Sequence, residues 1–252
     1  HLAAHGHPAP RPAPHRAHGQ RGIGPPQRVV SRLVPHPAGA ADARGREESI
    51  PVERVVAEAS LLLEKGAREI TLLGQSVDKY GYGLSPKSSL AELLAAVHAL
   101  PGLVRLRFLT AHPKGVTREL FQAMAGLPKV CEHLHAPAQS GSDRILAAMR
   151  RRYTREQYDS LLETGRSVLP GIVYTSDFIV GFPGETEQDF LQTLDLVEKQ
   201  RFGNIYAFRY SPRPNTPSAK MADDVPDAEK ERRLHALLQA QLRERQALQV
   251  QI

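Results

Sequence analysis

The chain has 252 residues, a size that suits one large α/β domain or two small domains. Its apolar content of 41% and charged content of 24% are ordinary for a folded protein, and no uncharged apolar run approaches the roughly 18–20 residues of a membrane span. The net charge of +6 does not by itself indicate nucleic-acid binding, because residues 1–44 hold six Arg and one Asp. Residues 45–252 therefore carry 27 basic and 26 acidic groups. We expect a cytoplasmic protein with no membrane segment.

Cysteine is almost absent from the sequence. Cys131 is the single thiol in the 252 residues. It has no intramolecular partner for a disulfide, and it cannot supply the three or four thiolates that hold an iron–sulfur cluster. The sequence therefore predicts no metal ligands of this kind.

Residues 1–44 differ in composition from the rest of the chain. They are rich in Ala, Pro, Arg and Gly, they hold six of the eleven histidines, and they lack helical or strand periodicity. Too few large apolar groups are present to offset the entropy of ordering, so we expect this segment to be disordered. A histidine-rich metal tract is the alternative. The composition also resembles GC-rich DNA translated out of frame.

From residue 45 onward, strand and helix signals alternate. The predicted helices cover 52–65, 90–100, 117–125, 143–149, 154–169, 186–199 and 226–249, and the predicted strands cover 69–73, 104–109, 130–135, 172–180 and 204–210. Thr154 with Gln157, and Thr186 with Asp189, have the spacing of capping boxes. This alternation predicts an α/β fold with a parallel sheet, either an incomplete (β/α) barrel or a doubly wound sheet.

Polar loops follow all five predicted strands. They lie at 74–75, 112–113, 139–142, 181–185 and 211–214. Parallel-sheet proteins bind their ligands at the carboxyl ends of the strands, so these loops predict the rim of a binding site.

The segment 181–186, GFPGET, joins an apolar strand to a capped helix. Its first glycine allows close approach to a flat ligand, although a tight turn without a ligand has the same sequence. Asp177 lies in the strand before it. Because an unpaired buried carboxylate is costly, we expect Asp177 to meet a ligand hydroxyl or a basic partner.

The segment 139–143, QSGSD, precedes a predicted helix. Gln139 and Ser140 suit a ribose or carboxylate ligand. Ser142 or Asp143 can equally serve only as the helix N-cap.

Cys131, His133 and His135 fall on one face of a predicted strand. A thiol and two imidazoles are zinc ligands, but three ligands on one flat strand rarely complete a tetrahedron. The preferred interpretation is a core cysteine beside two hydrogen-bonded histidines.

Three arginines at 150–152 end one predicted helix. Cations are favoured at a helix C-terminus, and this interpretation is preferred. Contact with RNA phosphates is the alternative.

Six motifs occur in one order between residues 73 and 217, within a match that covers about 175 residues. They are LLGQSVDKYG (73–82), FLTAHP (108–113), HLHAPAQSGSDRIL (133–146), MRRRYTREQY (149–158), SDFIVGFPGETEQDF (176–190) and YSPRPNTP (210–217). This series resembles the radical S-adenosylmethionine (SAM) core of the methylthiotransferase family, and within it the tRNA 2-methylthio-isopentenyladenosine synthase branch. The ribosomal protein S12 branch is the alternative, although it usually carries acidic residues after YSP.

The resemblance implies a fold, a reaction and a site. The fold would be an incomplete (β/α) barrel lacking its first strand. The activity would be methylthiolation of isopentenyladenosine beside the tRNA anticodon, with SAM, 4Fe–4S clusters and an electron-donor protein. Gly74 and Gln75 would lie near the methionyl part of SAM, and Gln139, Ser140 and Asp177 near its ribose and carboxylate. Gly181 would pass beside the adenine.

The chain departs from the family pattern where the cluster would bind. The family's Cys-x-x-x-Cys-x-x-Cys motif would fall near Ser31, Pro35 and Ala38, none of which is a thiolate ligand. We divide the chain into residues 1–44, a core at 45–225, and a helix at 226–252 that would lead into an RNA-binding β-domain. Without the cysteines we expect the enzyme to be inactive as written. A non-enzymatic scaffold that binds SAM or RNA is a further alternative. The oligomeric state is not predicted.

Overall fold

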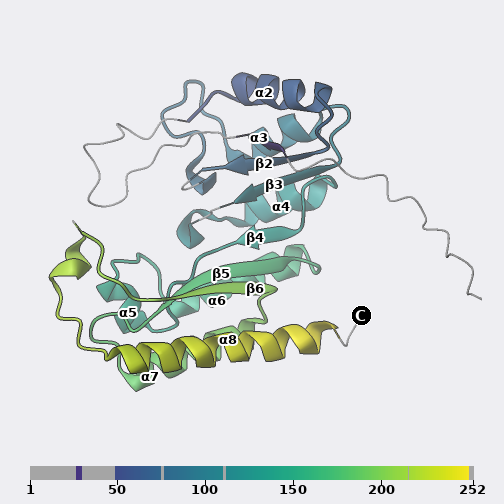
Figure 1. Cartoon of the computed structure of the whole chain (residues 1–252). Coiled ribbons are helices and arrows are strands. Elements are labelled where there is room, and N and C mark those ends of the chain that lie inside the picture. The colour runs from purple at the N-terminus through teal and green to yellow at the C-terminus, as the bar shows by residue number, and fades with distance from the viewer. Residues whose placement is uncertain (1–26, 30–48, 75–76, 110–111, 215, 250–252) are drawn as a thin grey trace, which may run out of the picture.

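The computed structural model describes residues 27–29, 49–74, 77–109, 112–214 and 216–249, with backbone only for 27–29 and 247–249. Within these residues, strands and helices alternate along the chain (Figure 1). The strands are β1 (Gln27–Val29), β2 (Glu69–Leu73), β3 (Arg105–Leu109), β4 (His133–His135), β5 (Val173–Val180) and β6 (Asn204–Arg209). The helices are α2 (Val52–Glu64), α3 (Leu90–His98), α4 (Arg118–Gly126), α5 (Asp143–Ala148), α6 (Arg155–Val168), α7 (Glu187–Gln200) and α8 (Asp227–Gln249), with short 3-10 turns η1 (Val77–Lys79), η2 (Pro113–Gly115) and η3 (Pro217–Lys220).

All described strand pairs are parallel. One sheet has the order β1-β2-β3 and the other the order β4-β5-β6. An isolated parallel bridge between Leu106 and Val130 joins them, with the Cys131 amide donating to the Leu106 carbonyl at 2.9 Å. The strands therefore follow one another in chain order across a single curved surface that does not close, which confirms the predicted incomplete barrel.

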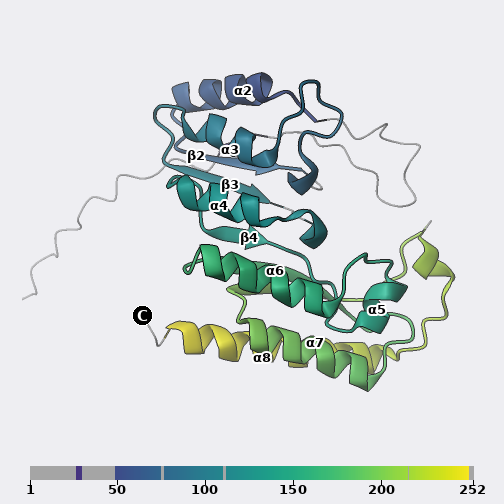
Figure 2. The ribbon, with the colours of Figure 1, turned by 180° about the vertical axis from the view of Figure 1, so that it is seen from behind.

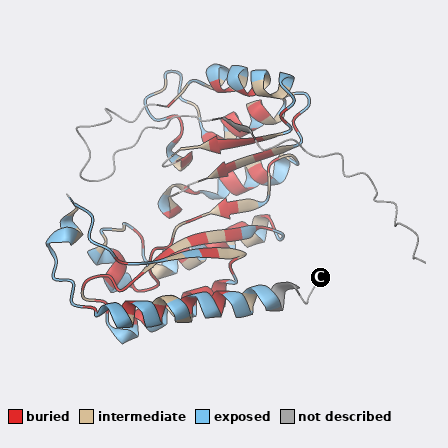
Figure 3. Cartoon of the chain, viewed as in Figure 1, coloured by how far each residue is buried: buried red, intermediate tan, exposed pale blue. Residues whose placement is uncertain are grey.

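Helices α3, α4, α6 and α7 cover one face of this surface, and they stand in front of the strands when the molecule is turned round (Figure 2). Alternate residues of β5 reflect this arrangement, because Tyr174, Ser176 and Phe178 are buried while Thr175 and Asp177 are half-buried on the opposite face (Figure 3).

The helix starts follow the capping signals. Thr154 and Gln157 form a reciprocal capping box, as do Thr186 and Asp189. The Ser142 hydroxyl accepts from the Ile145 amide at 3.4 Å and caps α5, so the N-cap interpretation of this serine is confirmed.

Two strands differ from expectation. β4 begins at His133 instead of residue 130, because the Cys131 amide is engaged by Leu106 and the His133 amide turns back to the Cys131 carbonyl at 2.7 Å. The expected absence of a first strand is wrong, since β1 pairs with residues 70–72 of β2. Parallel pairing along the open edge of β2, by a segment that ends in the β-branched Val29, accounts for it. The rest of the predicted disordered segment lies outside the described residues.

Candidate functional site at the carboxyl ends of the strands

The loops after β2, β3 and β4 are connected by direct contacts. The His112 amide donates to the Asp78 carboxylate at 2.7 Å, and the His112 ring meets the edge of Tyr153 with 5.6 Å between centroids. The Tyr153 hydroxyl in turn donates to the Ala138 carbonyl at 2.9 Å. Gly74 directly follows β2 in this group, whereas Gln75 lies outside the described residues.

Gln139 joins the next two loops through its backbone. Its amide donates to the Asp177 carbonyl at 2.8 Å, and its carbonyl accepts from the Ile179 amide at 2.9 Å. Its φ of +68° lies in the left-handed region, which is unusual for a residue other than glycine and recurs at binding sites. Gln139 and Asp177, predicted as site residues from separate motifs, therefore lie side by side.

Ser140 is only 2% exposed, and its hydroxyl lies 3.2 Å from that of Thr193 on α7. It also accepts from the Ser142 amide at 3.2 Å. In this structure the Ser140 side chain holds the loop against α7. Its predicted contact with a ligand stays a prediction.

Asp177 lies on the face of β5 that the helices leave open. Its carboxylate is 3.5 Å from His135 Nε2, and its side chain is 30% exposed. His135 Nδ1 and His133 Nε2 both lie near the Thr175 hydroxyl, at 3.0 and 3.1 Å. The expected basic partner of Asp177 is therefore a histidine. The side chain keeps enough exposure to meet a ligand as well.

Both histidines of the predicted zinc alternative are committed to Thr175 rather than to a shared ion. The described residues include no group of three His, Cys, Asp or Glu side chains arranged to hold a metal. Burial raises the pKa of the Cys131 thiol and lowers that of the His133 imidazole, so burial favours the neutral form of both.

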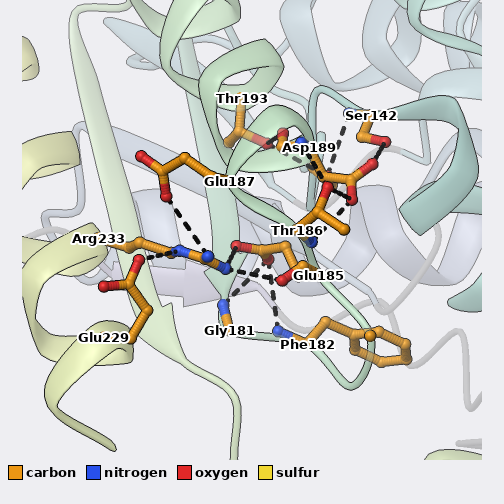
Figure 4. Close-up of polar contacts among 12 residues, drawn as sticks. Ser142, Gly181, Phe182, Glu185, Thr186, Glu187, Asp189, Thr193, Glu229 and Arg233 are labelled. Atoms are coloured by element: carbon orange, nitrogen blue, oxygen red, sulfur yellow. Dashed lines mark hydrogen bonds and ion pairs between the residues drawn. The ribbon is translucent and has the colours of Figure 1, made fainter. Parts of the chain in front are cut away.

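The turn after β5 is held by a buried ion pair that the sequence analysis missed. The Glu185 carboxylate accepts from the amide of Gly181 at 3.0 Å and from Arg233 of α8 at 2.9 Å (Figure 4). The two side chains are 3% and 6% exposed. Burial raises the pKa of Glu185, although the Gly181 amide and Arg233 oppose that rise. Gly181 has a φ of +72°, and a Cβ there would come within 2.3 Å of Lys230.

A second network fixes the start of α7. The Asp189 carboxylate accepts from the hydroxyls of Ser142 at 2.6 Å and Thr186 at 2.5 Å, and it pairs with Arg144. Burial alone raises the pKa of Asp189, but the hydrogen bonds from Arg144, Ser142 and Thr186 outweigh it and hold the pKa well below its ordinary value.

Helix α8 contributes to the site in a way that motifs do not reveal. Lys230, Arg233, Leu237 and Ala240 are buried, and they recur at the spacing of one helical face. This spacing could have predicted the buried face of α8 from the sequence. Two of the four residues are charged, however, so the face does not have the all-apolar pattern of a typical buried helix face.

A family model described as the Radical SAM superfamily matches residues 31–197, which is well over half of the chain. The chain belongs to the radical SAM superfamily. Its open parallel barrel, with polar loops at the strand ends, is therefore the core of such a protein.

Several similar proteins are synthases of the same name. The chain is 50% identical over 198 residues to a tRNA-2-methylthio-N(6)-dimethylallyladenosine synthase of Thermoanaerobacter sp. (strain X514), covering 79% of this chain and 42% of that protein. The synthase of Desulfosudis oleivorans is 51% identical over 202 residues, with 79% and 43% covered. The chain thus spans less than half the length of these relatives.

Solved structures share the fold at low identity. Streptococcus suis SuiB matches with a TM-score of 0.57 and 13% identity, over 87% of this chain and 47% of that chain. The radical SAM methyltransferase TsrM of Kitasatospora setae, solved with cobalamin and a [4Fe-4S] cluster, matches with a TM-score of 0.55 and 19% identity, over 69% and 33%.

The residues present suit one of the superfamily's two cofactors, SAM, but not the other, a 4Fe–4S cluster. The backbones of Gln139 and Asp177 are hydrogen-bonded at the strand ends, and the Asp177 carboxylate is partly exposed there, so it suits a hydroxyl of SAM. A 4Fe–4S cluster does not fit, because it needs three or four thiolates and Cys131 is the one cysteine in the sequence.

Among the described residues, no helix combines the length and the apolar character that a bilayer crossing demands.

Proposed function

We propose that the chain is the core of a tRNA methylthiotransferase of the radical SAM class, acting in the cytoplasm on isopentenyladenosine beside the anticodon. The observation that carries this proposal is the identity of about half of the aligned residues with synthases of that name over some 200 residues. The partners would be tRNA and an electron-donor protein.

The site residues have distinct parts in this proposal. Asp177, oriented by His135, and the Gln139 side chain would meet SAM, with Ser140 keeping their loop on α7. Gly74 and Gln75 would lie near the methionyl part of SAM, and Gly181 would let the backbone pass close to the adenine. When bound, SAM supplies the radical chemistry for which the superfamily is named.

The chain as written would not complete that reaction. Three thiolates are needed to hold the cluster that reduces SAM, and the positions near Ser31, Pro35 and Ala38 supply none. This favours a second candidate, a non-enzymatic scaffold that retains SAM or RNA binding.

Resequencing the coding DNA from upstream of codon 1 through codon 50 tests the first candidate. A restored frame with Cys-x-x-x-Cys-x-x-Cys should yield a protein that adds a 2-methylthio group to tRNA, read by mass spectrometry of the nucleosides. A restored frame whose product leaves tRNA unmodified would contradict the proposal.

Calorimetry of SAM binding in the absence of iron tests the second candidate. A scaffold selected for binding should take up SAM with an affinity in the micromolar range or tighter, and Asp177→Ala should weaken it. No measurable uptake by the unaltered chain would rule out the SAM-binding scaffold.

A further inference from the structure

A hollow of about 480 Å³ lies beside the rim, between η2, the start of α4 and α6. Its volume is within the range of roughly 300–1,000 Å³ that is usual for ligand pockets. It is lined by Pro113, Lys114, Val116, Arg118, Arg152, Tyr153, Gln157, Tyr158, Ser160, Leu161 and Thr164. The lining includes three cations and several hydroxyl groups but no carboxylate.

The three cations, Lys114, Arg118 and Arg152, are exposed. No ion pair joins any of them to a carboxylate within the part of the chain that the structure describes. Glu119 adjoins Arg118 in sequence but forms no ion pair with it and does not line the hollow. A hydrogen bond with Thr117 chiefly lowers the pKa of Glu119, and the charge of Arg118 lowers it further.

Several other described arginines form ion pairs with carboxylates. Arg105 and Arg107 both contact Glu69, and Arg155 contacts Asp159 and Asp195. Three cations gathered around one hollow whose lining has no carboxylate produce a local positive potential that attracts anions.

The positive potential also acts on the neighbouring His112. Burial lowers the pKa of His112, and the charges of Arg151, Lys79 and Lys114 lower it further. Positive charge from three separate segments thus converges beside the rim.

The hollow shares residues with the rim itself. Pro113 follows His112 directly, and Tyr153 both lines the hollow and donates to the Ala138 carbonyl, one residue before Gln139. A nucleotide whose base entered the rim would carry flanking phosphates toward these cations.

We propose that the hollow of Lys114, Arg118 and Arg152 binds backbone phosphates of the RNA strand that presents its base to the rim. This inference rests on the proposed function for the class of RNA. Arginine forks and hydroxyl groups are the usual phosphate ligands, and such contacts position an RNA without reading its sequence.

The test is the affinity of the 252-residue chain for a fluorescein-labelled RNA hairpin with the sequence of an anticodon arm, measured by anisotropy over a salt series. The variant Lys114→Gln, Arg118→Gln, Arg152→Gln should bind about tenfold or more weakly. Its plot of log affinity against log salt should be shallower by about 2, because each phosphate that the protein no longer neutralises reduces the slope by roughly 0.7.

The matched control is Arg54→Gln, Lys65→Gln, Lys87→Gln, which removes the same charge from exposed positions away from the hollow. It should bind RNA nearly as the unaltered chain does, with both triple variants showing the thermal midpoint of that chain. Equal weakening of the two variants, or no RNA binding by the unaltered chain, would overturn the proposal.

Added AMP separates RNA from a free nucleotide as the occupant. Displacement of the hairpin by AMP at a similar concentration would assign the hollow to free nucleotides and overturn the proposal. The assay needs neither SAM nor iron. Binding of the hairpin through the hollow, together with a restored-frame protein that leaves tRNA unmodified, would therefore support this inference and contradict the proposed function.

Discussion

The turn after β5 and the hollow beside α6 border the same rim, yet their charges are arranged in opposite ways. At the turn, Glu185 and Arg233 are almost wholly buried and satisfy one another, with the Gly181 amide as a third partner. In the hollow, Lys114 and Arg152 face solvent with no carboxylate partner among the described residues.

The difference indicates which charges stabilise the fold and which are available to a ligand. A charge that is desolvated must be matched within the protein, because an unmatched one costs several kcal/mol. A solvated cation with no partner contributes little to stability, and its charge remains free to attract an anion.

The largest effect is expected at the buried pair. Glu185→Gln keeps an oxygen for the Gly181 amide but removes the charge that faces Arg233, and it should lower the free energy of unfolding by about 3 kcal/mol. Urea denaturation measures it. Glu187→Gln is the control, since Glu187 is 50% exposed where it meets Arg232 and should cost less than about 1 kcal/mol. Equal costs would remove the distinction between the two kinds of charge.

Asp189 should make stability depend on acidity. Folding holds its pKa below the ordinary value of 3.8, so the unfolded chain binds the proton more readily. Its contribution, about 2 kcal/mol from charged hydrogen bonds, is present above that value and is lost as the pH falls below it.

Asp189→Asn should therefore destabilise the protein at pH 7 and flatten the fall in stability between pH 4 and pH 2, as read from urea midpoints. Asp195→Asn, at a carboxylate that is 67% exposed, serves as the comparison and should change neither. If the stability of Asp189→Asn falls with pH as steeply as that of the unaltered chain, the hydrogen-bond network at the start of α7 does not depend on the charge of Asp189.

A smaller effect separates backbone strain from packing at the turn. Gly181 and Gly83 both have positive φ, +72° and +80°, but an added Cβ would meet Lys230 at the first and open space at the second. Gly181→Ala should cost about 1 kcal/mol more than Gly83→Ala, because Lys230 is itself held by Asp223 at 2.7 Å. Thermal unfolding of the two variants measures the difference. An equal loss of stability in both would mean that Lys230 and α8 move aside for the added methyl group without a cost in free energy.

The smallest effect is expected in the hollow. The triple change of Lys114, Arg118 and Arg152 to Gln should alter the free energy of unfolding by less than about 0.5 kcal/mol, because none of the three is in an ion pair with another described residue. A loss above about 2 kcal/mol in urea denaturation would show that these cations hold the fold.

Local signals in the sequence predicted most elements of this fold. The capping boxes at Thr154 and Thr186 set the starts of α6 and α7, and strand β2 has the predicted bounds. Adjacent loops of parallel strands brought Gln139 and Asp177 together as expected. Pairings between distant segments were not predictable in this way. The ion pair of Glu185 with Arg233, 48 residues apart, depends on how α8 packs, and no motif encodes it.

The central claim is that this chain has a radical SAM core but no ligand set for the cluster. Anaerobic reconstitution with iron and sulfide, followed by assay of iron content and SAM cleavage, tests it most directly, with a full-length relative as the control. We predict no stoichiometric iron and no cleavage by this chain. About four bound irons per chain with SAM cleavage would contradict the claim, because the chain would then hold a cluster through ligands other than cysteine.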